Sequence, residues 1–313
     1  MKTTTLEAIL AAVPGKPWAE ATLEASPGTI TLDKARAWHT CGINRVSLGV
    51  QSFVRQEIAA TGRKHTAEIV ASDLETLREA GIDNFNIDLI AGLAGQTAAS
   101  WRDSLDWIEK LAPPHVSVYM LEIDEDSRLG RESLLGGVRY GAANIPSDVE
   151  TADMYELAVE RLEALGIPRY EISNFARPGF QSAHNLKYWR LLPYIGFGAD
   201  AHSFDGMLRW QNVESPAEYV ACGAGSRPAQ PGASGAGQVG NLPHAANLTE
   251  EKFFVGLRLS AGIRPTSDEW RIFEGPIRRF VNEGLLESQG DTLRLTGRGV
   301  LLSNEVFQEF LNL

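Results

Sequence analysis

Short strand-like runs alternate with amphipathic helical patterns along the first two thirds of this 313-residue chain. These runs are rich in Val, Ile and Leu, as expected where helices cover a parallel sheet. The alternation predicts βα units, because neighbouring parallel strands need a crossover connection that is usually a helix. Five strands are predicted, namely Glu20–Ala25, Arg45–Val50, Phe85–Ile90, His115–Leu121 and Arg169–Asn174.

The helical segments between these runs carry recognisable start and stop signals. Thr66 is a candidate N-cap, and the Pro-Pro pair at 113–114 stops the helix that precedes it. Ser147 and Glu150 have the spacing of a capping box. Gly166 stands where the helix begun by that box should end, because glycine readily adopts the left-handed C-terminal conformation.

Two architectures satisfy this pattern, a doubly wound nucleotide-binding sheet and a (β/α) barrel. The doubly wound fold calls for a glycine fingerprint after a strand, and the stretch G-F-G-A-D-A at 196–201 fails at its last position. In a barrel, polar residues at the carboxyl ends of the strands point into one mouth. Polar residues do stand at these strand ends, so we favour an α/β fold with an incomplete (β/α) barrel.

The chain divides into three predicted regions. Residues 1–222 form the barrel, and residues 223–247 read as a flexible linker rich in Gly, Ala and Pro. Residues 248–313 are predicted to form a small winged-helix-like α+β domain, with helices at 250–260, 276–282 and 296–310 and a hairpin at 285–295. That domain carries ten acidic and eight basic residues from position 250 onward, which argues against DNA binding.

Charge and cysteine content exclude several classes of protein. The net charge of -11 disfavours nucleic acid and anionic membranes as partners. No apolar run is long enough to span a bilayer and no signal peptide is visible, so we expect a cytoplasmic protein without stable membrane insertion. The two cysteines, Cys41 and Cys222, cannot build a disulfide scaffold or a cysteine-ligated metal site. Cys41 reads as a small buried hydrophobe at a helix end.

Four polar residues near the strand ends form the candidate site. Glu24, Gln51 and Asp88 each lie within or beside an apolar run, and Arg63 lies in a following loop. Any one of them could be a solvated strand end, but together they predict a convergent ligand site. An amino-acid-like ligand fits, because carboxylates can hold its ammonium group or ribose hydroxyls while Arg63 holds its carboxylate.

Several segments, in this order, carry a resemblance to a known family. They read L-E-A-S-P-G-T, N-R-V-S-L-G-V-Q-S-F, G-R-K-H, N-I-D-L-I-A-G-L-A-G-Q-T, Y-E-I-S-N-F-A-R-P-G and H-N-L-K-Y-W. The sequence resembles the radical S-adenosylmethionine (SAM) proteins related to oxygen-independent coproporphyrinogen III oxidase. Within that group it most resembles the haem chaperones, to which the His-Asn-x-x-Tyr-Trp element belongs.

The resemblance implies a partial (β/α) barrel with a small C-terminal domain, and it implies ligands for particular residues. The family's SAM contacts fall on Glu24, Gln51, Arg63 and Asp88. The histidine of the His-Asn-x-x-Tyr-Trp element, which is implicated in holding haem, falls on His184. The alternative for His184 is a loop histidine with local hydrogen bonds. His202, in a second matching element, reads as structural or pocket-lining.

One defining element of the family does not occur in the printed sequence. This element is a Cys-x-x-x-Cys-x-x-Cys run that holds a [4Fe–4S] cluster, and its absence predicts a chain that begins inside the family's barrel. We therefore assign no metal ligand and no catalytic residue here, and expect the cluster only if a further N-terminal segment exists. Enzyme activity is left open.

Three functions remain open at this point. The first is a haem-chaperone-like radical SAM protein that binds haem or porphyrin and passes haem to an acceptor protein. The second is a haem-binding remnant without cluster or radical chemistry. The third is an oxygen-independent coproporphyrinogen III dehydrogenase.

Overall fold

The computed structural model describes residues 1–123, 131–132, 135, 143–221, 240–245 and 247–311. The chain divides into two compact units, Met1–Ser182 and Ala183–Leu313. This division falls inside the region 1–222 that the sequence assigned to one barrel. Cys222 and most of the predicted linker lie outside the described residues.

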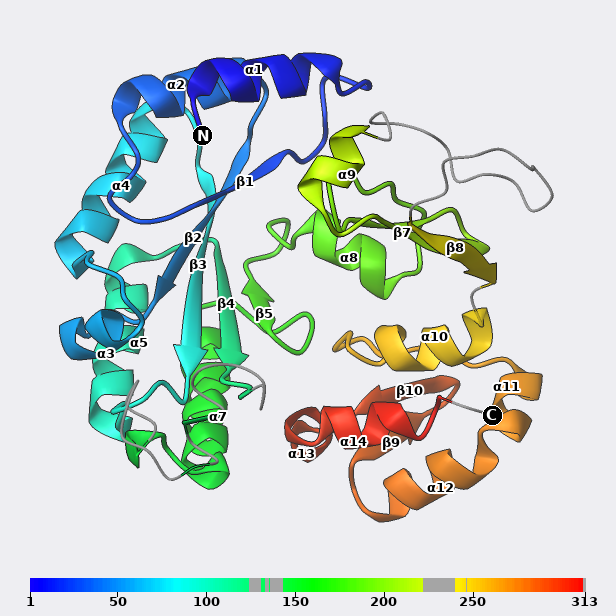
Figure 1. Ribbon diagram of the computed structural model, residues 1–313. Helices are drawn as coiled ribbons and strands as arrows, with labels where there is room; N and C mark the ends of the chain where they lie inside the picture. Colours follow the sequence, from blue (N-terminus) through cyan, green and yellow to red (C-terminus); the bar gives the residue numbers. More distant parts are fainter. Residues whose placement is uncertain (124–130, 133–134, 136–142, 222–239, 246, 312–313) are drawn as a thin grey trace. The chain divides into compact units, whose positions relative to one another are not determined.

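A five-stranded sheet forms the centre of the first unit, with the strand order β1-β2-β3-β4-β5 (Figure 1). Neighbouring strands from β1 to β4 pair in parallel, as predicted, whereas β5 runs antiparallel to β4. The strands are β1 (Thr22–Ala25), β2 (Arg45–Gln51), β3 (Asn84–Ala91), β4 (His115–Met120) and β5 (Asn174–Ala176).

The fifth predicted strand, Arg169–Asn174, is wrong in position. The backbone turns there instead of extending, because the Tyr170 amide donates to the Asn174 carbonyl and the Asn174 amide donates to the Glu171 carbonyl. The Glu171 carboxylate also accepts from the Ser173 amide at 3.0 Å. This local turn delays the strand until Asn174.

Most helices of the first unit lie along one face of the sheet, whereas α1 (Thr3–Ala12) lies across one end of it, beside α2 (Leu32–Thr40) (Figure 1). Two predicted helix starts are confirmed: the Thr66 hydroxyl accepts from the Ile69 amide, and Ser147 and Glu150 form a capping box. Gly166 has φ 73° just after its helix, as the sequence predicted. The helices are α1 (Thr3–Ala12), α2 (Leu32–Thr40), α3 (Arg55–Ala60), α4 (Ala67–Glu79), α5 (Ala98–Leu111) and α7 (Asp148–Ala164).

The core of this unit lies between the helices and the apolar face of the sheet. Alternate apolar residues of β2, β3 and β4 point into it, and nine of these side chains are at most 1% exposed. The helices contribute Leu74 from α4, Trp101 from α5 and Ala158 from α7, each fully buried. The apolar strand residues are Val46, Leu48 and Val50 in β2, Phe85, Ile87, Leu89 and Ala91 in β3, and Val116 and Val118 in β4.

The second unit contains a three-stranded antiparallel sheet that the sequence did not predict. Its order is β6-β7-β8, and β8 lies within the range 223–247 that was predicted to be a linker. That prediction is wrong for 240–245. The elements are α8 (Ala183–Trp189), β6 (His202–Phe204), β7 (Leu208–Asn212), α9 (Pro216–Ala221) and β8 (Gly240–Ala245).

The C-terminal part of this unit contains short helices and a hairpin. Phe253, Phe273 and Phe310 are almost fully buried, and their ring centroids lie 4.3 to 5.3 Å apart. The hairpin is confirmed, whereas the closing helix predicted at 296–310 is two helices that meet at Leu302. The elements are α10 (Leu248–Gly256), α11 (Ser267–Ile272), α12 (Glu274–Asn282), β9 (Leu286–Gln289), β10 (Thr292–Leu295), α13 (Gly297–Leu301) and α14 (Ser303–Gln308).

Among the described residues, no helix has the length and apolar character needed to cross a membrane.

Trp101 gives a direct test of the core. Its side chain is 0% exposed, and its indole N–H donates to the Met154 carbonyl of α7 at 2.7 Å. We expect Trp101→Ala to lower the free energy of unfolding by about 3 to 5 kcal/mol, because it leaves a cavity between two helices. Urea denaturation followed by circular dichroism measures this. Trp107→Ala, on the partly exposed side of α5, is the matched control, and equal losses in both variants would contradict the assignment of the core.

Candidate functional site

The face of the sheet opposite the helices is lined by polar side chains. Side chains alternate along the strands, so that residues between the apolar positions point to this second face. Strand register sets them in rows. One row joins Glu24, Ser47, Asn86 and His115, and the next joins Gly49, Asp88, Ser117 and Asn174. The sequence prediction of Val/Ile/Leu-rich strands therefore describes only one face.

Glu24 and Asp88 lie close enough to interact electrostatically. They lie on the two strands that flank β2, and the Ser47 hydroxyl between them donates to Asp88 Oδ2 at 3.2 Å. Burial raises the pKa of Asp88, hydrogen bonds from its polar neighbours oppose that shift, and the charge of Glu24 adds to it. Two carboxylates so placed favour a positively charged ligand.

Gln51 and Arg63 lie together over Gly49. The Arg63 guanidinium donates to the Gly49 carbonyl at 2.7 Å. A Cβ at position 49 would lie 3.2 Å from the Gln51 side-chain nitrogen and 3.4 Å from an Arg63 nitrogen. A side chain at position 49 would therefore crowd the ends of Gln51 and Arg63, which would have to shift by a few tenths of an ångström. Since Gly49 pairs in register with Asp88, the structure places Gln51 and Arg63 near Asp88, which lies in the second half of β3. Glu24 lies near the carboxyl end of β1.

Gln51 has a strained backbone. Its φ is 71°, and the register between β2 and β3 shifts between Gly49 and Gln51. A non-glycine residue in the left-handed region costs about 1 to 2 kcal/mol. Such strain is found preferentially at ligand sites, where the surrounding structure holds it in place. We define the site patch as Glu24, Gln51, Arg63 and Asp88.

A buried polar network lies next to the site patch, and the sequence analysis missed it. Asn86 donates to Asp88 Oδ1 at 2.6 Å, and its own Oδ1 lies 2.6 Å from His115 Nδ1. His115 is 0% exposed, and its Nε2 lies 3.0 Å from the Tyr170 hydroxyl. The alternation H-V-S-V-Y in β4 was the available signal, because it places His115, Ser117 and Tyr119 on one face.

His184 lies in the second unit, on α8, and its side chain is exposed. Its Nε2 is 3.1 Å from the Tyr188 hydroxyl, and the two rings meet edge to face with centroids 4.9 Å apart. Tyr188 packs in turn against Tyr194 at 4.6 Å. His202 is exposed at the start of β6. An exposed imidazole can ligate a haem iron, so the residues of α8 fit that group.

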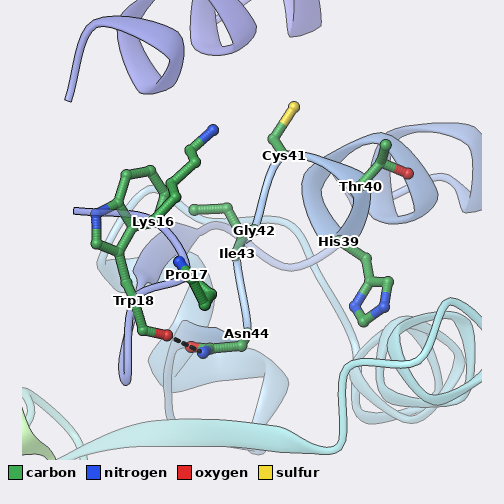
Figure 2. Close-up of a pocket in the computed structure, with 9 residues that line it drawn as sticks. All are labelled: Lys16, Pro17, Trp18, His39, Thr40, Cys41, Gly42, Ile43 and Asn44. Carbon is green, nitrogen blue, oxygen red and sulfur yellow. Dashed lines mark hydrogen bonds between the residues drawn. The ribbon is translucent and has the colours of Figure 1, made fainter. Parts of the chain in front are cut away.

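A surface hollow of about 530 Å³ lies at the amino ends of β1 and β2, away from the site patch. It is lined by residues 16–18 and 39–44. Figure 2 shows Lys16 and Trp18 on one side of it, and His39 and Cys41 on the other. The side chain of Asn44 donates to the Trp18 carbonyl at 3.3 Å. The prediction that Cys41 is a buried hydrophobe is wrong, because it caps the end of α2 beside this hollow and is half-buried.

The described residues contain no group of three or more His, Cys, Asp or Glu side chains arranged to hold a metal ion. Three thiolates are needed for a [4Fe–4S] cluster of this type, and Cys41 is the one cysteine in the described part of the chain. The described residues therefore do not fit an iron–sulfur cluster.

Known proteins similar to this chain are radical SAM proteins and haem chaperones. Residues 3–108 match the model of the Radical SAM superfamily, and residues 244–302 match that of the HemN C-terminal domain. The chain is 32% identical over 312 residues to "Heme chaperone HemW" of Bacillus subtilis, covering 95% of this chain and 77% of that protein. It is 34% identical to the protein of the same name from Mycobacterium tuberculosis, covering 94% and 72%.

A solved structure shares the fold. The chain aligns with coproporphyrinogen III oxidase (HemN) from Escherichia coli, a radical SAM enzyme, with a TM-score of 0.76 and 19% identity. The alignment covers 99% of this chain and 74% of that one. It supports an α/β fold of the radical SAM type with a small C-terminal region that contains a hairpin.

The buried His115 predicts a pH dependence of stability. Burial, with a smaller effect of the Arg45 charge, lowers the pKa of His115 well below its ordinary value of 6.5. Below pH 6.5 the unfolded chain therefore binds a proton that the folded chain does not, and stability falls on acidification by up to about 1.4 kcal/mol per pH unit. Urea denaturation between pH 7 and pH 5 measures this slope. We expect His115→Asn to make it shallower, and an unchanged slope would contradict the assignment.

Proposed function

The chain belongs to the HemW family of radical SAM proteins, and on that premise we propose that it binds S-adenosylmethionine at the site patch and haem at His184. In this proposal the protein holds haem for transfer to an acceptor protein. The described residues hold no cluster ligands, so the chemistry assigned to them is binding and orientation. We assign them no radical step.

The charge pattern of the site patch carries the SAM part of the proposal. S-adenosylmethionine has two positive groups, the ammonium and the sulfonium, and one carboxylate. The patch offers the reverse, two carboxylates from Glu24 and Asp88 and one guanidinium from Arg63. Charge-assisted hydrogen bonds of this kind are stronger than neutral ones and fix the orientation of the ligand. Gln51 adds an amide that can donate to or accept from a polar group of the ligand.

The setting of His184 supports the haem part. The exposed imidazole on α8, flanked by Tyr188 and beyond it Tyr194, would supply a nitrogen ligand for the haem iron beside aromatic surface. Aromatic side chains can pack on the flat face of a porphyrin. The exposed His184 beside Tyr188 also supports a second candidate function, a haem-binding protein without radical chemistry.

Haem titration tests the role of His184. Adding haem to the purified protein should shift the Soret absorption, and His184→Ala should weaken binding about tenfold, or ~1.4 kcal/mol. His202→Ala is the matched control, because His202 is another exposed histidine of the same unit. It should bind within about twofold of the wild type. Equal affinity of wild type and His184→Ala would exclude His184 as the ligand.

Calorimetry with S-adenosylmethionine tests the site patch. Arg63→Gln and Glu24→Gln should each weaken binding about tenfold, since each removes one charge-assisted contact. Asp103→Asn, at an exposed position of α5, controls for the change in net charge. Haem binding without any SAM binding would favour the second candidate function over the first.

A further inference from the structure

Four side chains form an unbroken hydrogen-bonded line across the polar face of the sheet. The line runs from Tyr170 to His115, Asn86 and Asp88, with successive distances of 3.0, 2.6 and 2.6 Å. His115 and Asn86 are 0% and 3% exposed. Because water does not reach these groups, each must satisfy its hydrogen bonds within the line or with immediate neighbours.

The direction of the line follows from the chemistry of its last member. An ionised Asp88 can only accept, so Asn86 must present its NH₂ group to it. The carbonyl oxygen of Asn86 then faces His115, which must donate from Nδ1. A neutral ring with its proton on Nδ1 has a bare Nε2, which accepts from the Tyr170 hydroxyl. The Tyr170 oxygen in turn accepts from the Ser182 amide at 3.2 Å.

The surroundings of His115 keep its ring neutral. Burial lowers the pKa of His115, and the positive charge of Arg45 lowers it further. At the far end of the line, burial raises the pKa of Tyr170 well above its ordinary value of 10, and the charges of Glu171 and Glu20 add to that shift, so its hydroxyl keeps its proton. The same tautomer therefore holds through the neutral range.

We propose that His115, as its Nδ1–H tautomer, and Asn86 are positioning residues that fix the Asp88 carboxylate for the ligand of the site patch. Asn86 donates a hydrogen bond to Oδ1 of Asp88 at 2.6 Å. Oδ2 accepts a longer bond of 3.2 Å from Ser47 and is therefore the oxygen that we assign to the ligand. The effect on the ligand rests on the proposed SAM site. The tautomer of His115 is a property of the chain itself and can be measured without any ligand.

Nuclear magnetic resonance of protein labelled with ¹⁵N in histidine reads the tautomer directly. We expect His115 in the neutral Nδ1–H form at pH 7, identified by loss of its signals in His115→Asn or by their shift in Tyr170→Phe. His65 provides an internal control, because it is also buried and its Nε2 lies 3.1 Å from the Val50 carbonyl. It should therefore be the opposite tautomer, Nε2–H. A charged His115, or one protonated on Nε2, would overturn the proposal.

Two isosteric variants then test the positioning role. In His115→Asn the side-chain amide can replace Nδ1–H as donor to Asn86, whereas in His115→Gln the amide reaches toward Tyr170 and leaves Asn86 without that donor. We expect S-adenosylmethionine to bind His115→Asn within about twofold of wild type and His115→Gln about tenfold more weakly. Thermal melts of both variants separate this effect from loss of folding.

The outcomes distinguish this proposal from the proposed function. Equal affinities of the two variants would overturn the positioning role even if the tautomer is correct. If the wild-type chain binds no S-adenosylmethionine, the proposed SAM site is wrong and the positioning role is wrong with it. The ¹⁵N spectrum of His115 still determines the direction of the hydrogen bonds between Tyr170 and Asp88 in that case. An Nδ1–H signal from His115, together with a loss of S-adenosylmethionine affinity in His115→Gln but not in His115→Asn, supports both the positioning role and the proposed SAM site.

Discussion

The period of two along β2, β3 and β4 is the constraint on which the first unit depends. It sends Val, Ile, Leu and Phe side chains to the helices and Arg, Ser, Asn, Asp and His side chains to the other face. A slip of one residue in register would exchange these two sets and bury the polar one against the helices. The register of the sheet, the position of the core and the location of the site are therefore set by one pattern.

A polar face is stable only where its groups are hydrogen-bonded to one another. Asn86 contacts Ser47, Asp88, His115 and Ser117, so β3 is tied to β2 and to β4 by side chains as well as by backbone. Ser117 extends the network to Asn174 on β5 at 2.8 Å. Removing one partner from such a network leaves a buried group unsatisfied, which costs more than the net value of the bond itself.

Much of this architecture was predictable because its signals are local. The caps at Thr66 and Ser147 and the parallel order of four strands follow from short motifs and alternation. The convergence of Glu24, Gln51 and Asp88 was predictable for another reason: carboxyl ends of parallel strands share one edge. Whether these residues contact S-adenosylmethionine, and whether His184 holds haem, remain predictions.

The features that the sequence did not predict depend on contacts between distant parts of the chain. The bond from His115 to Asn86 spans 29 positions and that to Tyr170 spans 55, so neither leaves a local signal. Strand β8 pairs with β7 although it follows a run rich in Gly, Ala and Pro, and pairing there overrides weak propensity. The turn at Tyr170–Asn174 likewise overrides the apparent strand, because side-chain bonds from Glu171 hold it.

Two features of the site patch lower the stability of the folded chain, namely the left-handed backbone of Gln51 and the burial of Asp88 beside Glu24, and they favour a ligand-binding role. Without a ligand, the left-handed backbone of Gln51 would be relieved by glycine, and the half-buried Asp88 beside Glu24 would be more stable as a neutral or apolar side chain. In the proposed function, a positive group of the ligand between the two carboxylates reduces their mutual repulsion and gives Asp88 Oδ2 a partner in addition to Ser47. In the proposed function, the groups that cost the sheet stability are therefore those that favour a positively charged ligand, and the line from Tyr170 to Asp88 holds the Asp88 carboxylate in position for it.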